Sequence, residues 1–211
     1  MNQVNRLVID LQYFPTINYY ITLYRYTDII FEQYDYHRKM SFRNRCSIAG
    51  ANGPINLSVP IIGGREQRVI TKDVKIDNSE KWQIQHWRSV ISSYNRSPFF
   101  EHFEEDLRSL YGRKFTFLLD WNLACMNWLE INNVKNRHFT CTSGYLKVYD
   151  PGDFDDLRDW FFPRWLEERV KNPVTYRQVF EDKNGFIPNL SVLDFLFCEG
   201  PQRLNQLQVK S

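Results

Sequence analysis

Short apolar runs separated by polar stretches open the chain, in a pattern typical of a sheet-containing fold. Leu7–Leu11 is short and mostly apolar, as a strand buried on both faces would be. Apolar side chains then recur at helical spacing through Ile17–Tyr24, and Asp28–Phe31 is a second apolar run. Such a compact strand–helix–strand unit predicts two parallel strands joined by a right-handed crossover.

A hairpin is predicted after this unit. Asn44–Ile48 and Ile55–Ile61 flank Ala49–Pro54, which contains an Asn-Gly pair. Asn-Gly favours the tight turns that join antiparallel strands. Val69–Ile76 is apolar enough to add a further strand.

The rest of the chain has mainly helical periodicity. One apolar stripe runs from Ile84 to Tyr94, and Ser97 before Pro98 is typical of an N-cap followed by proline at the first helical position. Asp150–Glu168 mixes acidic, aromatic and proline residues without a clean period, so a loop or mobile flap is expected there. Further helices are expected over Phe117–Val134, after Asn172–Pro173 and over Ser191–Phe197.

These patterns predict an α/β fold in one domain. A small mixed sheet from the N-terminal half, with a β-α-β start, would be covered by helices from the C-terminal half. Residues 1–78 would be sheet-rich, 79–201 mostly helical and 202–211 a polar tail. With 211 residues, 43% hydrophobic and 16% aromatic, the chain can bury a substantial core, and a disordered body is not expected.

Charge and cysteine usage narrow the class of protein. A net charge of +2 gives no general attraction to nucleic acid or to an anionic membrane. No apolar run approaches the roughly 18–20 residues of a membrane span, and no signal-peptide pattern is present, so a cytoplasmic protein is predicted. The four scattered cysteines lack zinc-binding spacing, so no metal site is expected. Glycine-rich phosphate-binding motifs are absent, which argues against classical dinucleotide and P-loop binding, and no cofactor is indicated.

The predicted topology gives a place for a binding site. Ligands of open α/β sheets bind beyond the carboxyl ends of the strands. The first strand ends at Gln12 and Tyr13, and the second leads into Gln33–Arg45. If the two strands are parallel, both polar segments emerge at the same edge of the sheet.

The run Tyr36–Arg45 is the strongest candidate for ligand contacts. It holds four Lys and Arg side chains and no acid, so an anionic small molecule would relieve their mutual repulsion. Arginine pairs bidentately with phosphate or carboxylate, and aromatic side chains stack on a base or sugar ring. A solvated basic turn before a hairpin is the plainer alternative. The predicted ligand-binding residues are Gln12, Tyr13, Tyr36, Arg38, Lys39, Arg43, Asn44 and Arg45.

His86 is the candidate for proton transfer. A helical wheel places it off the apolar stripe, near Trp82, from where it would reach the site as a general base. The alternative is a surface histidine that packs on Trp82. Cys46 follows Arg45, but no Cys–His–acid pattern supports it as a nucleophile.

The order of several motifs resembles the WbqC-like proteins, a bacterial family linked to surface-polysaccharide biosynthesis. The resemblance runs from Gln12 to Pro201, and its closing part is similar to the branch found in Bacteroidetes-type bacteria. Two positions differ from the usual family pattern: Phe42 stands where Trp is frequent, and Leu11-Gln12-Tyr13 stands where a Gln-Pro start is common. The matching segments are Gln12–Pro15, Arg43–Arg45, Gly53-Pro54, Leu57–Pro60, His86, Tyr94, Pro98–Phe100, Gly185–Ser191, Leu193-Asp194 and Glu199–Pro201.

The resemblance implies a role in making or decorating a glycan. The leading hypothesis is a transferase that acts on a phosphate-bearing donor, a nucleotide-sugar or an activated acyl group. Gln12 and Asn44 would orient the ligand, and aromatic residues of Trp160–Trp165 would close over it. The alternative is a non-catalytic module that docks an acidic protein or glycan. A concave pocket with His86 beside the basic residues would indicate the enzyme, and a flat surface would indicate the module.

Overall fold

The computed structural model describes residues 5–63, 68–132 and 137–207. Its centre is a four-stranded sheet in the order β5-β2-β1-β6, and every neighbouring pair of strands is parallel. The strands are β1 (Arg6–Asp10), β2 (Asp28–Glu32), β5 (His138–Cys141) and β6 (Asp155–Asp156). The predicted α/β class is confirmed, but two of the four strands of this sheet, β5 and β6, come from the C-terminal half of the chain.

The predicted strand–helix–strand unit is confirmed. β1 and β2 pair in parallel from Arg6 opposite Asp28 to Asp10 opposite Glu32. The crossover contains α1 (Ile17–Thr22) and a short 3-10 helix. Thr16 caps α1, because its hydroxyl accepts a hydrogen bond from the Tyr19 backbone N–H at 3.3 Å.

The hairpin is also confirmed, as a separate two-stranded sheet of β3 (Arg45–Gly50) and β4 (Gly53–Ser58). Gly53 has φ +110°, which only glycine adopts easily, so the turn depends on this residue. The expected strand over Val69–Ile76 is wrong. This stretch contains a 3-10 helix over Thr71–Asp73 and joins its neighbours only through isolated bridges.

Three helices follow the hairpin: α2 (Trp82–Tyr94), α3 (Phe100–Gly112) and α4 (Leu118–Asn132). The predicted face of α2 is partly wrong, because Ile84 is exposed while His86 is buried. Ser97 is not the N-cap of α3, since the helix begins at Phe100 and the Ser97 hydroxyl donates to the Tyr94 carbonyl. Residues 133–134 of the expected helix lie outside the described residues.

The C-terminal part differs more from expectation. The expected flap over residues 150–168 contains β6 and the start of α5 (Pro163–Arg169), so it is partly regular structure. No helix starts directly after Asn172–Pro173; the short α6 (Glu181–Asn184) comes later. α7 (Val192–Leu207) includes the expected last helix and bends at Gly200, whose φ is +78°. Residues 208–211 of the expected tail are not among the described residues.

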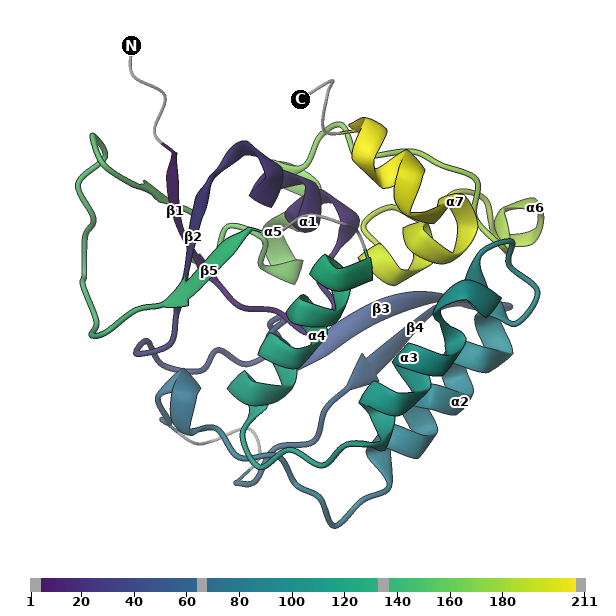
Figure 1. The fold of residues 1–211 in the computed structure, drawn as a ribbon, viewed down its shortest axis with the longest axis horizontal. Helices are drawn as coiled ribbons and strands as arrows, with labels where there is room; N and C mark the ends of the chain where they lie inside the picture. The colour runs from purple at the N-terminus through teal and green to yellow at the C-terminus, as the bar shows by residue number, and fades with distance from the viewer. Residues whose placement is uncertain (1–4, 64–67, 133–136, 208–211) are drawn as a thin grey trace.

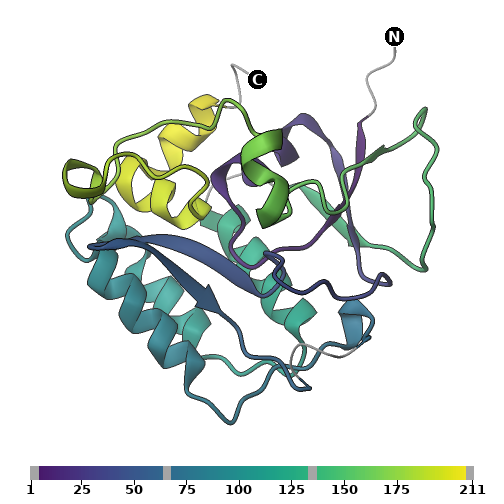
Figure 2. The ribbon, with the colours of Figure 1, turned by 180° about the vertical axis from the view of Figure 1, so that it is seen from behind.

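The elements are arranged around the hairpin. Figures 1 and 2 show the hairpin and α4 between the parallel sheet and the pair α2–α3, with α7 beside α1. The core is rich in aromatic rings, and Tyr13, Phe14 and Trp121 are almost completely buried in it. None of the helices in the described part of the chain combines the length and apolarity needed to cross a bilayer. This packing leaves the carboxyl edge of the sheet uncovered by helices α2, α3 and α7.

Candidate functional site

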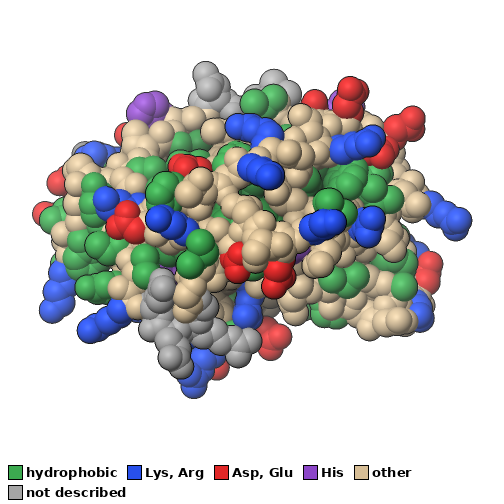
Figure 3. All heavy atoms as spheres, turned by 90° about the horizontal axis from the view of Figure 1, so that it is seen from below, with side chains coloured by type: hydrophobic (Ala, Val, Ile, Leu, Met, Phe, Trp, Pro, Cys, Tyr) green, Lys and Arg blue, Asp and Glu red, His purple; other side chains and the backbone are tan. Residues whose placement is uncertain are grey.

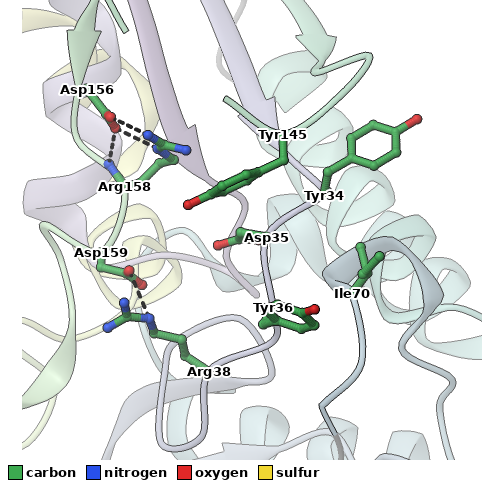
Figure 4. Close-up of a pocket in the computed structure, with 9 residues that line it drawn as sticks. All are labelled: Tyr34, Asp35, Tyr36, Arg38, Ile70, Tyr145, Asp156, Arg158 and Asp159. Carbon is green, nitrogen blue, oxygen red and sulfur yellow. Dashed lines mark hydrogen bonds and ion pairs between the residues drawn. The ribbon is translucent and has the colours of Figure 1, made fainter. Parts of the chain in front are cut away.

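A cavity of about 630 Å³ lies at the carboxyl edge of the parallel sheet. The segments that follow β2, β5 and β6 contribute to its lining, because the parallel topology brings their carboxyl ends to one edge. In Figure 4 two ion pairs stand on one side of the cavity, and two tyrosines with an isoleucine stand on the other. The lining residues are Tyr34, Asp35, Tyr36, Arg38, Ile70, Tyr145, Asp156, Arg158 and Asp159.

Arg43 lies behind this lining and is fully buried. Its two terminal nitrogens donate to both carboxylate oxygens of Asp35, at 3.0 and 2.5 Å. They also donate to the Thr71 hydroxyl at 2.8 Å and, more weakly, to Asp159 at 3.4 Å. The terminal nitrogens of the guanidinium group are therefore occupied by the protein itself, whereas the buried Nε has no hydrogen-bond partner among the described residues.

Asp159 is held in an unusual conformation at the edge of the cavity. Its φ of +54° is in the left-handed region, which costs a non-glycine residue of order 1 kcal/mol or more. The backbone N–H of Asp159 donates to Asp10 Oδ1 at 2.9 Å, and this bond holds the strained turn. The Asp159 carboxylate pairs with Arg38 Nε at 3.0 Å. Burial raises the pKa of Asp159, Arg43 opposes the rise, and the nearby Asp10 adds to it.

Arg158 forms a second ion-pair network in the wall. It pairs with Glu32 at 3.2 Å and with Asp156 at 2.6 Å. Glu32 ends β2 and is completely buried, and Asp156 ends β6. The wall thus joins strands that are more than a hundred residues apart in sequence.

Cationic groups stand close to the aromatic wall. The Arg68 guanidinium carbon lies 5.3 Å from the centre of the Tyr36 ring, and Lys72 Nζ lies 5.0 Å from the centre of the Tyr34 ring. Arg38 and Arg158 are the basic residues of the lining itself. Arg68 and Lys72 therefore add positive charge at the tyrosine side of the cavity, whereas Arg38 lies with the ion pairs on the other side (Figure 4).

Comparison with known families adds the identity of the fold family. The sequence profile of the WbqC-like protein family matches residues 12–143, more than half of the 211-residue chain. The chain belongs to the WbqC-like protein family. No curated protein and no solved structure matches the chain significantly.

Only part of the basic run Tyr36–Arg45, which was predicted to bind the ligand, lines the cavity of this WbqC-like protein. Tyr36 and Arg38 line the cavity, and Lys39 is exposed next to them. Arg43 is buried behind the lining. Arg45 does not line the cavity, and its contact is the sulfur of Met40 at 3.1 Å.

The other predicted contacts are buried. Gln12 is 1% exposed, and its Nε2 donates to Asp10 Oδ2 at 3.1 Å. Asn44 Nδ2 donates to the Val59 carbonyl and so joins the residue before β3 to the residue after β4. Tyr13 lies in the aromatic core. Gln12 alone of these three contacts the carboxylate network of the site, and it does so through Asp10.

His86 is also separate from the cavity lining of the WbqC-like protein. It is 6% exposed, and its Nδ1 lies 3.0 Å from the Tyr13 hydroxyl, which in turn lies 2.7 Å from the Tyr111 hydroxyl. Burial lowers the pKa of His86 to about 4, and a hydrogen bond with the Ser58 backbone opposes this shift. The ring is therefore neutral at physiological pH and ties α2 to the segment after β1.

Sequence reasoning missed most of the acidic residues of the site. Asp35 directly precedes the basic run, and its position after the second strand was a usable signal. Asp156, Arg158 and Asp159 had no such signal, because β6 is only two residues long and both are acidic.

The face of the molecule seen in Figure 3 carries charges of both signs. Figure 3, a view from below, shows Lys and Arg side chains interspersed with Asp and Glu side chains across that face. Such mixing gives little net field for a large acidic partner. In the cavity wall, by contrast, the charged side chains form two ion-pair networks.

Proposed function

We propose that this WbqC-like protein is a transferase of bacterial surface-glycan biosynthesis that binds a phosphate-bearing donor in the cavity. The donor would be a nucleotide-sugar or an activated acyl group. One observation carries the proposal: a concave site at the carboxyl edge of a parallel sheet, lined by tyrosine, carboxylate and guanidinium groups. The glycan setting is the role that the family resemblance implies.

The phosphate would bind at the basic side of the cavity. Among the described residues Arg38 uses only its Nε, in the pair with Asp159, so its terminal nitrogens are available for a bidentate contact. Arg68 and Lys72 stand against the tyrosine rings on the other side of the cavity and would add positive charge. Arg43 would not bind the phosphate directly, because it does not line the cavity and its terminal nitrogens already donate to Asp35 and Thr71.

The sugar would bind against the rings and carboxylates. Tyr36 and Tyr145 line the cavity and are each 55% exposed, so their rings are available for stacking on a pyranose. Each oxygen of Asp159 accepts one hydrogen bond from an arginine, and a carboxylate oxygen has capacity for a second. Sugar hydroxyl groups would fill that capacity.

Asp159 is the best-placed proton acceptor. It lines the cavity, and its raised pKa makes it a stronger base than an ordinary aspartate. In the transfer, the acceptor oxygen or nitrogen would attack the donor carbon and give its proton to Asp159. The phosphate-bearing leaving group would depart with the electrons of the broken bond, with its charge stabilised by Arg38.

Binding without catalysis is the second candidate. It is favoured by the position of His86, which was expected to lie beside the basic residues and does not line the cavity. The concave shape of the cavity argues for a small ligand in either case. A turnover assay with a ligand that binds would separate the two candidates.

A thermal-shift screen with UDP-glucose, acetyl-coenzyme A and inorganic phosphate tests the proposal. A ligand at 100 times its Kd stabilises the native state by about 2.7 kcal/mol, which raises the melting temperature by several degrees. We expect Arg38→Ala to abolish the shift. Arg88→Ala is the matched control, since Arg88 is exposed on α2 and does not line the cavity. No shift with any phosphate-bearing ligand, or an equal shift in Arg38→Ala, would refute the proposal.

A further inference from the structure

The ion pairs around the cavity are not balanced in charge. In the first network Arg38 and Arg43 face three carboxylates, those of Asp10, Asp35 and Asp159. In the second network Arg158 alone faces two carboxylates, Glu32 and Asp156. Each network thus holds one more carboxylate than guanidinium group. Uncompensated negative charge next to a partly buried cavity is costly, so a cationic ligand group would stabilise it.

A buried side chain in the first network lacks a hydrogen-bond donor. The amide of Gln12, 1% exposed, reaches Asp10, where Nε2 donates to Oδ2. Its Oε1 is buried and has no hydrogen-bond partner among the described residues. Reversing the amide would place Oε1 against the Asp10 carboxylate, so the negative charge fixes this orientation. The Arg43 Nε–H of the same network is in turn a buried donor without a hydrogen-bond partner in the described part of the chain, so what the network lacks is positive charge rather than donors.

The other charged groups near the cavity do not remove the imbalance. Arg68 and Lys72 are placed against the rings of Tyr36 and Tyr34, and no ion pair joins either of them to the five carboxylates within the described ranges. His37 follows Tyr36 and is neutral near pH 7, since burial and then Arg43 lower its pKa to about 4. The positive charges of Arg68 and Lys72 therefore lie outside the two acidic networks and do not balance them.

A metal ion is a poorer explanation than an ammonium group. No three His, Cys, Asp or Glu side chains in residues 5–63, 68–132 and 137–207 are placed to hold a metal ion. The carboxylates are instead separated by the arginines that pair with them. An ammonium needs only hydrogen-bond acceptors around it, and it carries three donors.

We infer that the cavity is specific for an amino-sugar phosphate, with the protonated amine on the carboxylates of Asp159 and Asp35 and the phosphate toward Arg38. The inference rests on the proposed function, because it names the substrate class of the same site. Asp159 has an unused acceptor position on each oxygen, and Asp35 lies beside it in the lining. The amine supplies the positive charge that the networks lack.

Calorimetric titration with three sugar phosphates tests the inference at a pH where the amine is protonated. The probes are glucosamine 1-phosphate, glucose 1-phosphate and N-acetylglucosamine 1-phosphate. We expect the free amine to bind at least about tenfold more tightly than the other two esters, a difference of roughly 1.4 kcal/mol. Equal or tighter binding of glucose 1-phosphate or of the acetylated ester would overturn the inference and leave the proposed function intact. Absence of binding by all three esters would also overturn the inference, whereas the proposed function is overturned only if the thermal-shift screen shows no ligand either.

Two variants show whether the preference arises at this cavity. Asp159→Asn keeps the shape of the side chain and the backbone bond to Asp10, so we expect the preference for the amine to fall while glucose 1-phosphate still binds. Asp106→Asn is the matched control, because Asp106 is exposed on α3 and does not line this cavity. An unchanged preference in Asp159→Asn would place the amine elsewhere and overturn the inference.

If that variant does not fold, Tyr36→Leu and Tyr36→Phe, at an exposed ring, provide the comparison. Reduced affinity for all esters in the leucine variant only is expected, and equal affinity would contradict binding in this cavity.

Discussion

Replacing Arg43 by alanine separates a structural arginine from a ligand-binding one. The variant removes the guanidinium group that joins Asp10, Asp35 and Asp159. Asp35 would lose both of its bonds from arginine, and three acidic side chains would be left without their shared counter-charge. Breaking a buried ion pair by removing one partner costs about 3–5 kcal/mol. Since Arg43 is fully buried, solvent would not compensate for the loss.

Urea denaturation followed by far-UV circular dichroism measures this cost. With a slope of roughly 2 kcal/mol per molar urea, a loss of 3–5 kcal/mol lowers the unfolding midpoint by about 1.5–2.5 M. Arg43→Lys keeps the charge but not the bidentate geometry, so an intermediate loss is expected. The variant Arg88→Ala, at an exposed position of α2, should change the free energy of unfolding by less than about 0.5 kcal/mol.

The outcome that would refute this reasoning is a stable Arg43→Ala protein. A loss below about 1 kcal/mol, as for an exposed ion pair, would show that the three carboxylates do not depend on Arg43. If that stable variant also lost binding of phosphate ligands, Arg43 would be a ligand contact, as the sequence alone suggested. The structure leads us to expect the opposite: a large loss of stability.

Three further predictions concern positions outside the cavity. His86→Gln should reduce the loss of stability between about pH 6.5 and 4, by up to about 3 kcal/mol, because the buried neutral ring resists the proton that the unfolded chain accepts; denaturation at several pH values checks this. Asp194→Asn should act with the opposite sign: burial raises the pKa of this carboxyl from 3.8 to about 6, so wild-type stability falls as pH rises through that range by about 3 kcal/mol, and the variant should lack that fall. Gly200→Ala should lower the melting temperature, since φ is +78° and the new methyl group would lie 2.8 Å from the Phe99 ring; an unchanged midpoint would contradict the need for glycine there.

The parts of the fold that local patterns determine were predictable from the sequence. The apolar runs Leu7–Leu11 and Asp28–Phe31 predicted two strands, and they pair in parallel. The Asn-Gly pair predicted the hairpin turn, where Gly53 has a positive φ. In each case the signal and the structure lie within about thirty residues of chain.

The charged network could not be derived from the same patterns. The argument that the cations of Tyr36–Arg45 need an anionic ligand considered only that run, whereas the acids that neutralise Arg43 come from outside it. β6 consists of Asp155 and Asp156, and hydrophobic periodicity cannot indicate a strand of two acidic residues. Its partner in the sheet is about 150 residues away in sequence.

The burial of His86 depends on tertiary partners, which a helical wheel does not include. A helical wheel ranks side chains by polarity, so Ile84 was expected inside and the histidine at the edge. In the structure the opposite holds, because the imidazole packs on Trp82 and finds a hydrogen-bond partner in Tyr13. A polar ring with satisfied nitrogens can be buried in an aromatic core. Tertiary partners of this kind are not visible in a single helix.

The position of β6 also affects the order in which the chain can assemble. One edge of β1 is covered early by β2, but the other edge has no partner until residues 155–156 have been synthesised. At a translation rate of about 5–20 residues per second, the stretch from residue 32 to residue 156 takes roughly 6–25 s. During that interval an apolar strand edge is open to pairing with another nascent chain. A chaperone that covers the emerging N-terminal half would therefore protect this edge until β6 has been made.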